Sequence, residues 1–464
     1  MVKIRPKRVS VLALAFLLAA CSAEVAVPRP SETPSASPRP TASPRPTNAA
    51  NDVIYFRSVG SGAVANILAI DVRTGATLRT LPDGSPSFDR STLLTTEDAK
   101  GSTQTVVRRL DVGSGRELGS FTLTGTYHSV WTDGGQTALS RDGHRLALSI
   151  FPYQSNGDWV TGFRVVDAEG GAIEATLDLK GKSTYGFVAM SPDGRSLYLN
   201  QFGEGGTAMR VFDVPSGTLL PATALAGAVG QTGSRAAPVF SPDGRWMFTL
   251  DAGSPTSYCA SSDGPRCTPK ADEQPYFLAL DLGSRRMVTV PLPMEQRSTD
   301  FEKYLLWSLA ITRDGATVYA INPAIGVVDE LDARQMTLRR TSKITVSHAD
   351  QGMLAAIGRL FFPVADAKRY ITGGALLSPS GDRIYAAAYK GIAVVDTRDL
   401  SSRAVWQSEG EFDALALTAD GERLYAVSNT GRRISIIATR DGTKLGELVI
   451  PAFAQAIFRI DSSP

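Results

Sequence analysis

The chain has 464 residues, of which 43% are apolar and 20% are charged, and its formal net charge is +2. Four positive residues, Lys3, Arg5, Lys7 and Arg8, lie at the extreme N-terminus, so the rest of the chain carries about +2 − 4 = −2. This near-neutral balance excludes a basic nucleic-acid-binding protein. The apolar content excludes a disordered chain beyond residue 50.

The first 20 residues have the pattern of an export signal, with a basic start and an apolar run over 9–18 that is too short for an ordinary membrane span. Leu18-Ala19-Ala20-Cys21 resembles the lipobox of bacterial lipoproteins, which implies removal of residues 1–20 and lipidation of Cys21. The alternative is an ordinary secretory signal in which Cys21 is incidental. The lipobox resemblance implies an extracytoplasmic protein anchored by lipid to a bacterial membrane, either inner or outer.

Residues 21–50 follow as a tether, with seven prolines among Ser, Thr and Ala. Such a composition cannot bury a core, and proline favours extended backbone. We expect a disordered spacer between Cys21 and the folded domain over 51–464.

The folded domain contains a degenerate repeat in which two short apolar runs flank a polar turn. Proline presets φ, aspartate accepts hydrogen bonds from nearby amides, and glycine adopts the left-handed conformation, so each copy predicts a hairpin. The copies are Ser191-Pro192-Asp193-Gly194, Ser241-Pro242-Asp243-Gly244, Arg141-Asp142-Gly143, Arg313-Asp314-Gly315, Ser378-Pro379-Ser380-Gly381 and Ala419-Asp420-Gly421.

A third apolar run in each unit ends in an aspartate, typically followed by a second Gly-containing turn, and we expect these aspartates to be structural. They are Asp71, Asp111, Asp167, Asp213, Asp281, Asp332 and Asp396, with a degenerate copy ending at Asp441. The count predicts eight four-stranded units. The weakest, around Phe88-Asp89-Arg90, lacks the glycine, and without it the count is seven.

The first unit begins at its second strand, near Val53, while the chain ends with an extra strand over 456–460. We therefore predict an all-β fold, a single β-propeller of eight blades, or seven, closed by pairing of the N- and C-terminal strands. The Ser-Pro-Asp-Gly turns followed by Leu-Tyr or Val-Tyr strands resemble the YVTN-type bacterial β-propellers over residues 53–460. That resemblance implies the fold and leaves the ligand open.

The connections between strands two and three and between blades should share one face, and their irregularity suggests binding. The irregular stretches are 151–159, 201–207, 251–275, 293–304 and 345–371. Aromatic and arginine side chains there suit recognition. The candidate residues are Tyr127, His128, Trp131, Tyr153, Trp159, Tyr258, Arg297, Tyr304, Arg369 and Tyr370. Alternatively, several of them pack their loops onto the ring.

Cys259 and Cys267 lie eight positions apart in a Ser-, Gly- and Pro-rich stretch. In an exported protein we expect them to form a disulfide, with reduced thiols or metal thiolates as the alternatives.

The three histidines, His128, His144 and His348, fall in different connections and cannot form one metal site. We therefore expect a monomeric binding or scaffold module for an envelope protein, a wall polymer or an extracellular ligand, without a cofactor. The alternative is a metal-dependent hydrolase or lactonase with carboxylates around the central channel. The loop face supplies carboxylates at Asp133, Asp158, Glu204, Asp300 and Glu302, although scattered loop acids are mostly solvated.

Overall fold

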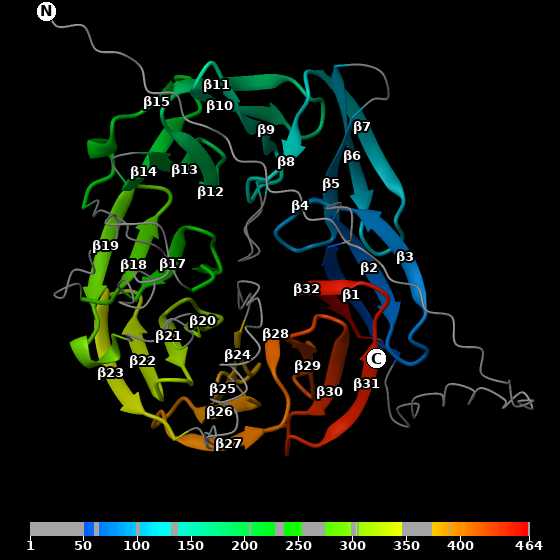
Figure 1. The fold of residues 1–464 in the computed structure, drawn as a ribbon, viewed down its shortest axis with the longest axis vertical. Helices are drawn as coiled ribbons and strands as arrows, with labels where there is room; N and C mark the ends of the chain where they lie inside the picture. The colour runs from blue at the N-terminus through cyan, green and yellow to red at the C-terminus, as the bar shows by residue number, and fades with distance from the viewer. Residues whose placement is uncertain are drawn as a thin grey trace, which may run out of the picture. The chain divides into compact units, whose positions relative to one another are not determined.

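The computed structural model describes residues 51–59, 65–98, 103–130, 138–203, 206–227, 236–252, 274–297, 303, 306–345, 374–388 and 390–462. These residues form eight antiparallel sheets of four strands, which follow one another around a ring in chain order (Figure 1). The chain is thus an eight-bladed β-propeller, as the repeat count predicts. No helix among the described residues is long and apolar enough to cross a membrane.

The first four blades are built as follows. Blade 1 contains β1 (Val53–Val59), β2 (Ala65–Asp71), β3 (Thr77–Pro82) and β32 (Phe453–Asp461). Blade 2 contains β4 (Gly84–Pro86), β5 (Thr92–Asp98), β6 (Gln104–Asp111) and β7 (Glu117–Thr124). Blade 3 contains β8 (His128–Ser129), β9 (Arg145–Ser155), β10 (Asp158–Asp167) and β11 (Ile173–Gly181). Blade 4 contains β12 (Thr184–Met190), β13 (Ser196–Gly203), β14 (Gly206–Asp213) and β15 (Thr218–Leu219).

The other four blades complete the ring. Blade 5 contains β16 (Val239–Phe240), β17 (Trp246–Asp251), β18 (Tyr276–Asp281) and β19 (Arg286–Pro291). Blade 6 contains β20 (Ser308–Ile311), β21 (Thr317–Asn322), β22 (Val327–Asp332) and β23 (Thr337–Lys343). Blade 7 contains β24 (Ala375–Leu377), β25 (Arg383–Ala387), β26 (Ile392–Asp396) and β27 (Ser402–Trp406), and blade 8 contains β28 (Phe412–Leu417), β29 (Arg423–Ser428), β30 (Arg433–Ala438) and β31 (Lys444–Val449).

The ring closes within blade 1, where β32 pairs antiparallel with β1 and places Ile54 opposite Ile460. The C-terminal strand therefore completes the blade that the N-terminal three strands begin, as predicted. At the junction with blade 8, the fully buried Asp52 accepts hydrogen bonds from Arg423 Nε at 2.8 Å and from the Tyr425 hydroxyl at 2.5 Å.

The turns between strands one and two share one hydrogen-bond pattern. In the copy at 191–194, the Ser191 hydroxyl donates to Asp193 Oδ1 at 2.7 Å, and the amide of Gly194 donates to the carbonyl of Ser191. Gly194 has a φ of +67°. The weak copy repeats this geometry, because the Ser87 hydroxyl donates to Asp89 at 2.6 Å and Arg90 takes the place of glycine with a φ of +59°.

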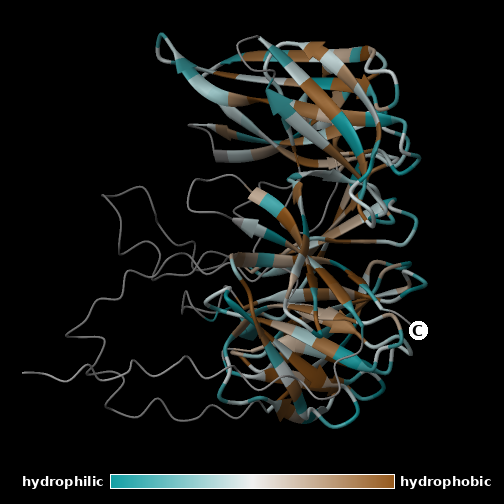
Figure 2. Ribbon diagram, turned by 90° about the vertical axis from the view of Figure 1, so that its right-hand side faces the viewer, coloured by the Kyte–Doolittle hydropathy of each residue, from teal (hydrophilic) through white to brown (hydrophobic). Residues whose placement is uncertain are grey.

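Apolar clusters fill the spaces between neighbouring blades. Both faces of a blade are covered by its neighbours, so second and third strands such as β21 and β26 are buried at every position. The fourth strand, such as β11, alternates between exposed and buried residues instead. Figure 2 shows the apolar residues in the strands and hydrophilic residues in the turns between them.

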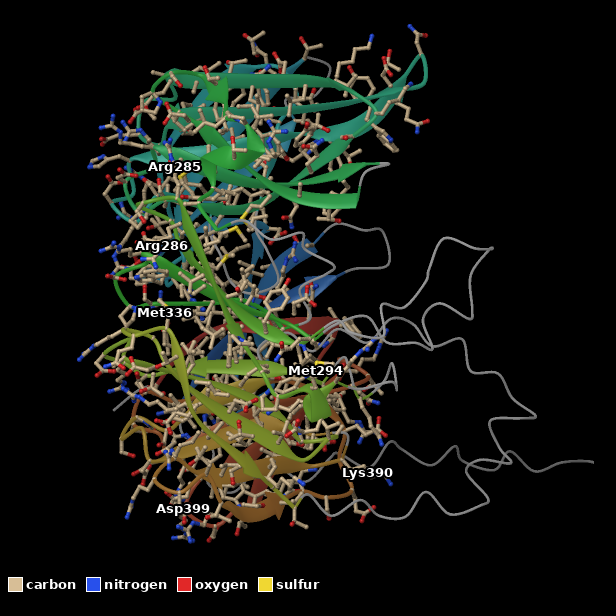
Figure 3. All side chains as sticks on the ribbon, turned by 90° about the vertical axis from the view of Figure 1, so that its left-hand side faces the viewer. Arg285, Arg286, Met294, Met336, Lys390 and Asp399 are labelled. Carbon is tan, nitrogen blue, oxygen red and sulfur yellow. The ribbon has the colours of Figure 1, made fainter. Side chains whose placement is uncertain are left out.

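The connections divide the ring into two faces. We call turn face the side that carries the turns between strands one and two and between strands three and four. We call loop face the side with the connections between strands two and three and between blades. Figure 3 shows Arg285, Met336 and Asp399, from strand three–four turns, on one side, and Met294 and Lys390 on the opposite side.

Candidate binding face

The loop face of blade 3 carries a long hairpin. Strand β9 has 11 residues and β10 has 10, and they pair as far as Ser155 and Asp158. Asn156 and Gly157, with φ values of +54° and +79°, form the two-residue loop between them. The connection predicted to be irregular over 151–159 is therefore a hairpin with a tight two-residue turn, and its irregularity is a register shift at Phe151 and Pro152, opposite Thr161.

Aromatic side chains are exposed on this hairpin. Phe151 is 68% exposed and Tyr153 is 53% exposed. The His128 ring lies edge-on to Phe151, with 4.5 Å between ring centroids, because β8 pairs with β9 and places His128 opposite Ser149. Trp159, on β10 opposite Gln154, is partly exposed. The hairpin thus presents aromatic surface from the paired residue Tyr153 and from Phe151, which lies at the register shift.

Polar contacts fix the hairpin at its tip. Lys182 Nζ lies 2.8 Å from Asp158 Oδ1 and donates to the carbonyl of Gly157 at 2.9 Å. The hydrogen bond from Lys182 also lowers the pKa of Asp158. These contacts join the tip to the end of β11, so the exposed rings need little further ordering to bind a partner.

The base of blade 3 is also ordered by polar and aromatic contacts. Arg164 donates to Asp178 at 2.8 Å across β10 and β11, and its guanidinium lies 5.5 Å from the centre of the Tyr127 ring. Tyr127 is buried in the core beneath the face. Tyr127 therefore supports the hairpin and does not present its ring to a partner.

Blade 4 adds a second exposed aromatic residue on the same face. Strands β13 and β14 pair in register up to Gly203 opposite Gly206, so the connection predicted to be irregular over 201–207 is also a hairpin. Phe202 is 45% exposed, and Gly186 leaves room for its ring, since a Cβ there would lie 3.3 Å from Phe202 Cε2. Strand β12 of this blade contacts β9 and β10 of blade 3.

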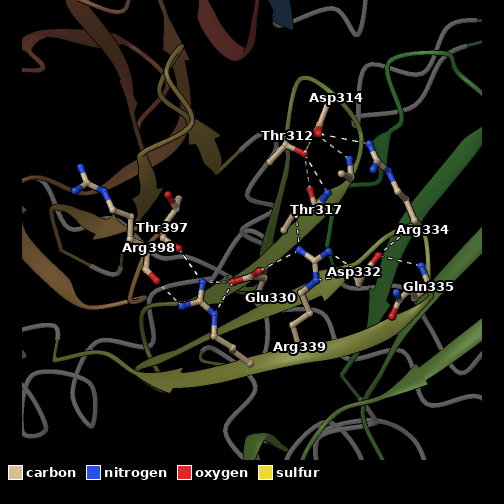
Figure 4. A network of polar contacts seen from close by, with 12 residues as sticks. Thr312, Asp314, Thr317, Glu330, Asp332, Arg334, Gln335, Arg339, Thr397 and Arg398 are labelled. Carbon is tan, nitrogen blue, oxygen red and sulfur yellow. Dashed lines mark hydrogen bonds and ion pairs between the residues drawn. The ribbon is translucent and has the colours of Figure 1, made fainter.

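The turn face of blade 6 carries a network of paired charged side chains. In blade 6, Arg339 bonds to Asp332 at 2.6 Å (Figure 4), and Arg340 pairs with the buried Glu330. Arg340 also donates to the carbonyl of Thr397 at 2.9 Å and so links blade 6 to blade 7. The exposed Phe88 of this face lies 3.8 Å beneath the Arg141 guanidinium.

Of the other predicted site residues, the structure describes Arg297, and the rest lie outside the described ranges. Arg297, which follows the 3₁₀ helix η3 (Met294–Gln296), is partly exposed on the loop face. Outside the described residues lie Cys21, Trp131, Tyr258, Cys259, Cys267, Tyr304, Arg369 and Tyr370, so the lipidation, the disulfide and this part of the face stay predictions.

Sequence reasoning missed Phe151 and Phe202 as exposed loop-face residues. The Asn156-Gly157 pair was the available signal, because Asn-Gly between alternating residues predicts a tight hairpin. Extending both strands by that rule would have placed Phe151 on the projecting part of β9. Phe202 had no comparable signal.

No group of three or more His, Cys, Asp or Glu side chains with a metal-binding arrangement exists among the described residues. Asp158 pairs with Lys182, while Asp133, Glu204, Asp300 and Glu302 lie outside the described ranges. The amide of His144 donates to Asp142 in a turn of the turn face, whereas His128 lies on the loop face. Nothing in the described part of the chain favours the hydrolase alternative.

Comparisons with known proteins give fold-level likeness only. No family model and no curated protein matches the chain. Among solved structures, apo AztD from Citrobacter koseri is 10% identical, over 89% of this chain and 98% of that one, with a TM-score of 0.47. Dihydro-heme d1 dehydrogenase NirN in complex with DHE is 14% identical, over 88% and 76%, with a TM-score of 0.46. A putative 6-phosphogluconolactonase from Bacteroides fragilis is 15% identical, over 82% and 100%, with a TM-score of 0.40.

Proposed function

We propose that this propeller is a binding module whose loop face, at blades 3 and 4, recognises a partner in the cell envelope. The observation that carries the proposal is the exposure of Phe151 and Tyr153 on a long hairpin whose tip is held by Lys182. Aromatic side chains contribute large contact areas at a low entropy cost, and a paired backbone adds little further ordering.

The place of action follows from the N-terminal pattern. A lipidated Cys21 and a proline-rich tether would hold a monomeric propeller outside the cytoplasm, on a bacterial membrane. The partner would be an envelope protein, a wall polymer or an extracellular ligand. A Cys21→Ser variant tests the anchor: it should lose incorporation of labelled lipid and leave the membrane fraction, and unchanged labelling would exclude lipidation at Cys21.

Site-specific photocrosslinking in cells tests the binding face. A photoreactive residue replaces Tyr153 or Phe202, and the matched control replaces Ile173, which is 48% exposed at the turn-face end of the same blade as Tyr153. A discrete adduct from Tyr153 and Phe202, absent from Ile173, supports recognition through the loop face. Equal adducts from all three positions, or none from any, would contradict it.

Purified protein then tests whether the same side chains provide the affinity. Phe151→Ala with Tyr153→Ala should weaken binding to the captured partner at least tenfold, since exposed aromatic anchors of an interface contribute about 1–2 kcal/mol or more each. Ile173→Ala should leave the affinity unchanged. Wild-type affinity in the double variant would assign recognition to other residues.

A further inference from the structure

A buried carboxyl group lies in blade 6, apart from the exposed aromatic residues. Asp329 is in the middle of β22, completely buried, and faces the space between blades 5 and 6 that Leu309, Val318 and Ala320 also line. Gln296 approaches it from η3, in the loop-face connection that joins blade 5 to blade 6, and is also buried. An acid side chain in such a place needs a specific partner.

One oxygen of this carboxyl group is well satisfied. Gln296 Nε2 donates to Asp329 Oδ1 at 2.8 Å, and the Thr341 hydroxyl donates to the same oxygen at 2.6 Å. Asp329 Oδ2 and Gln296 Oε1 are both buried and have no hydrogen-bond partner. An ionised carboxylate and an amide carbonyl are both acceptors, so they cannot satisfy one another, and leaving both unpaired is costly.

A proton on the carboxyl group removes this conflict. A carboxylic acid and a primary amide are both planar groups, and each offers one donor and one acceptor to the other. With a hydrogen on Asp329 Oδ2, the acid can donate to Gln296 Oε1 while it accepts from Gln296 Nε2. Both orphaned atoms then become partners in a second hydrogen bond.

The electrostatic surroundings agree with a protonated acid. Burial raises the pKa of Asp329 to about 6, against the opposing effect of the hydrogen bonds from Thr341 and Gln296. The neighbouring Glu330 points to the other side of the blade, where it pairs with Arg340. The same strands also carry Asp332 and Arg339, which pair with each other, and Lys343, two residues beyond Thr341 on β23, while Glu295 and Arg297 flank Gln296.

We propose that Asp329 holds a proton on Oδ2 in mildly acidic solution and donates it to Gln296, forming a doubly hydrogen-bonded pair that anchors the loop-face connection to blade 6. When the proton is lost, a charged carboxylate replaces the donor, one of the two bonds is broken, and the anchor at Gln296 weakens. The pair thus anchors this connection in a pH-dependent way. This pH dependence does not rest on the proposed binding function.

The direction of the pH effect follows from the raised pKa. The folded state keeps the proton up to about pH 6, whereas an unfolded chain loses it near the ordinary aspartate pKa of 3.8. The contribution of this acid to stability is therefore complete below the unfolded pKa and is lost as the pH rises through the folded one. The connection should be held firmly at pH 5 and loosely at pH 8.

Asp329→Asn is the decisive variant, because asparagine keeps the shape and can form both hydrogen bonds at any pH. The unfolding midpoint of the variant should match that of the wild-type full chain at pH 4 and exceed it by several degrees at pH 8. Asp281→Asn is the matched control, because Asp281 is a buried carboxyl group that accepts from Arg245 at 2.6 Å. This control should be less stable than the wild type at pH 8. Destabilisation of both variants at pH 8 would overturn the proposal.

Two further readouts examine the proton and the anchor directly. The infrared difference spectrum between wild type and Asp329→Asn at pH 5 should contain the carbonyl band of a protonated carboxylic acid. Trypsin at pH 8 should cleave after Arg297 several-fold faster in the wild type than in Asp329→Asn. A carboxylate band for Asp329 at pH 5 would overturn the proposal. Wild-type stability that depends on added Na⁺, Ca²⁺ or Mg²⁺, with this dependence lost in Asp329→Asn, would mean that a cation takes the place of the proton, and it would also overturn the proposal.

Discussion

The carboxyl groups in the turns of the turn face and the carboxyl group buried below the loop face have pKa values shifted in opposite directions. On the turn face, hydroxyl donors lower the pKa of Asp89, Asp314 and Asp420, each within its own turn. Below the loop face, burial raises the pKa of Asp329. The turn face therefore favours ionised acids that accept hydrogen bonds within their own turns, while the loop-face side holds an acid that favours its neutral form.

This difference indicates on which face the amino-acid sequence can change without disrupting the blades. Seven of the eight blades repeat the same backbone hydrogen bond in the turn between strands one and two, so a substitution there disrupts a pattern that fixes the blade itself. On the loop face, the connections differ in length and in residue type from blade to blade, and they present the aromatic side chains of blades 3 and 4. Stability should therefore depend on the turn face and recognition on the loop face.

The largest effect should come from the turn-face junction that closes the ring. Asp52→Ala removes the partner of Arg423 and Tyr425, whose side chains are largely or wholly buried. Breaking a buried ion pair leaves an uncompensated charge, which should lower the free energy of unfolding by about 3–5 kcal/mol. Urea denaturation measures this. Asp399→Ala, at an exposed pair with Arg403, should change it by less than about 1 kcal/mol, and equal losses in both variants would contradict a closing role for Asp52.

A smaller effect should distinguish two glycines of the same turn type. Gly381 and Gly421 have φ values of +74° and +75°, so alanine at either position should cost about 1 kcal/mol in strain. At Gly421 an added Cβ would also lie 2.5 Å from the Pro379 ring, whereas at Gly381 nothing lies within 4 Å. Gly421→Ala should therefore be the more destabilising by about 1–2 kcal/mol in denaturant unfolding. The reverse order would show that contact between adjacent turns does not matter.

The smallest effect on stability should come from the loop face. Phe151→Ala with Tyr153→Ala removes side chains that are more than half exposed, so the free energy of unfolding should change by about 0.5 kcal/mol or less. Phe163→Ala, in the same blade but fully buried, should cost about 3–5 kcal/mol in the same assay. A large loss in the double variant would mean that the hairpin is structural, and the division between the two faces would fail.

The sequence predicts those parts of the fold that depend on residues close together in the chain. Ser, Asp and Gly within a few residues determine each turn, so the blade count, the closure and even the copy with Arg90 in place of glycine can be read from the chain. The same rule applied to Asn156-Gly157 would have given the hairpin of blade 3. By contrast, Asp329 and Gln296 are 33 residues apart, and their pairing depends on two blades packing together. Asp329 also lies between Val328 and Glu330 on a third strand, where the sequence gives no sign of its partner.

The pairing of β1 with β32 has a consequence for the order in which the ring can form. Blades 2 to 8 each consist of strands that are neighbours in sequence. Each of them can therefore assemble as soon as its own stretch has been synthesised. Blade 1 must wait for residues 453–461, about 400 positions after β1. Until then β1 presents an unpaired edge to its surroundings, and the growing protein is an open row of blades with one incomplete end.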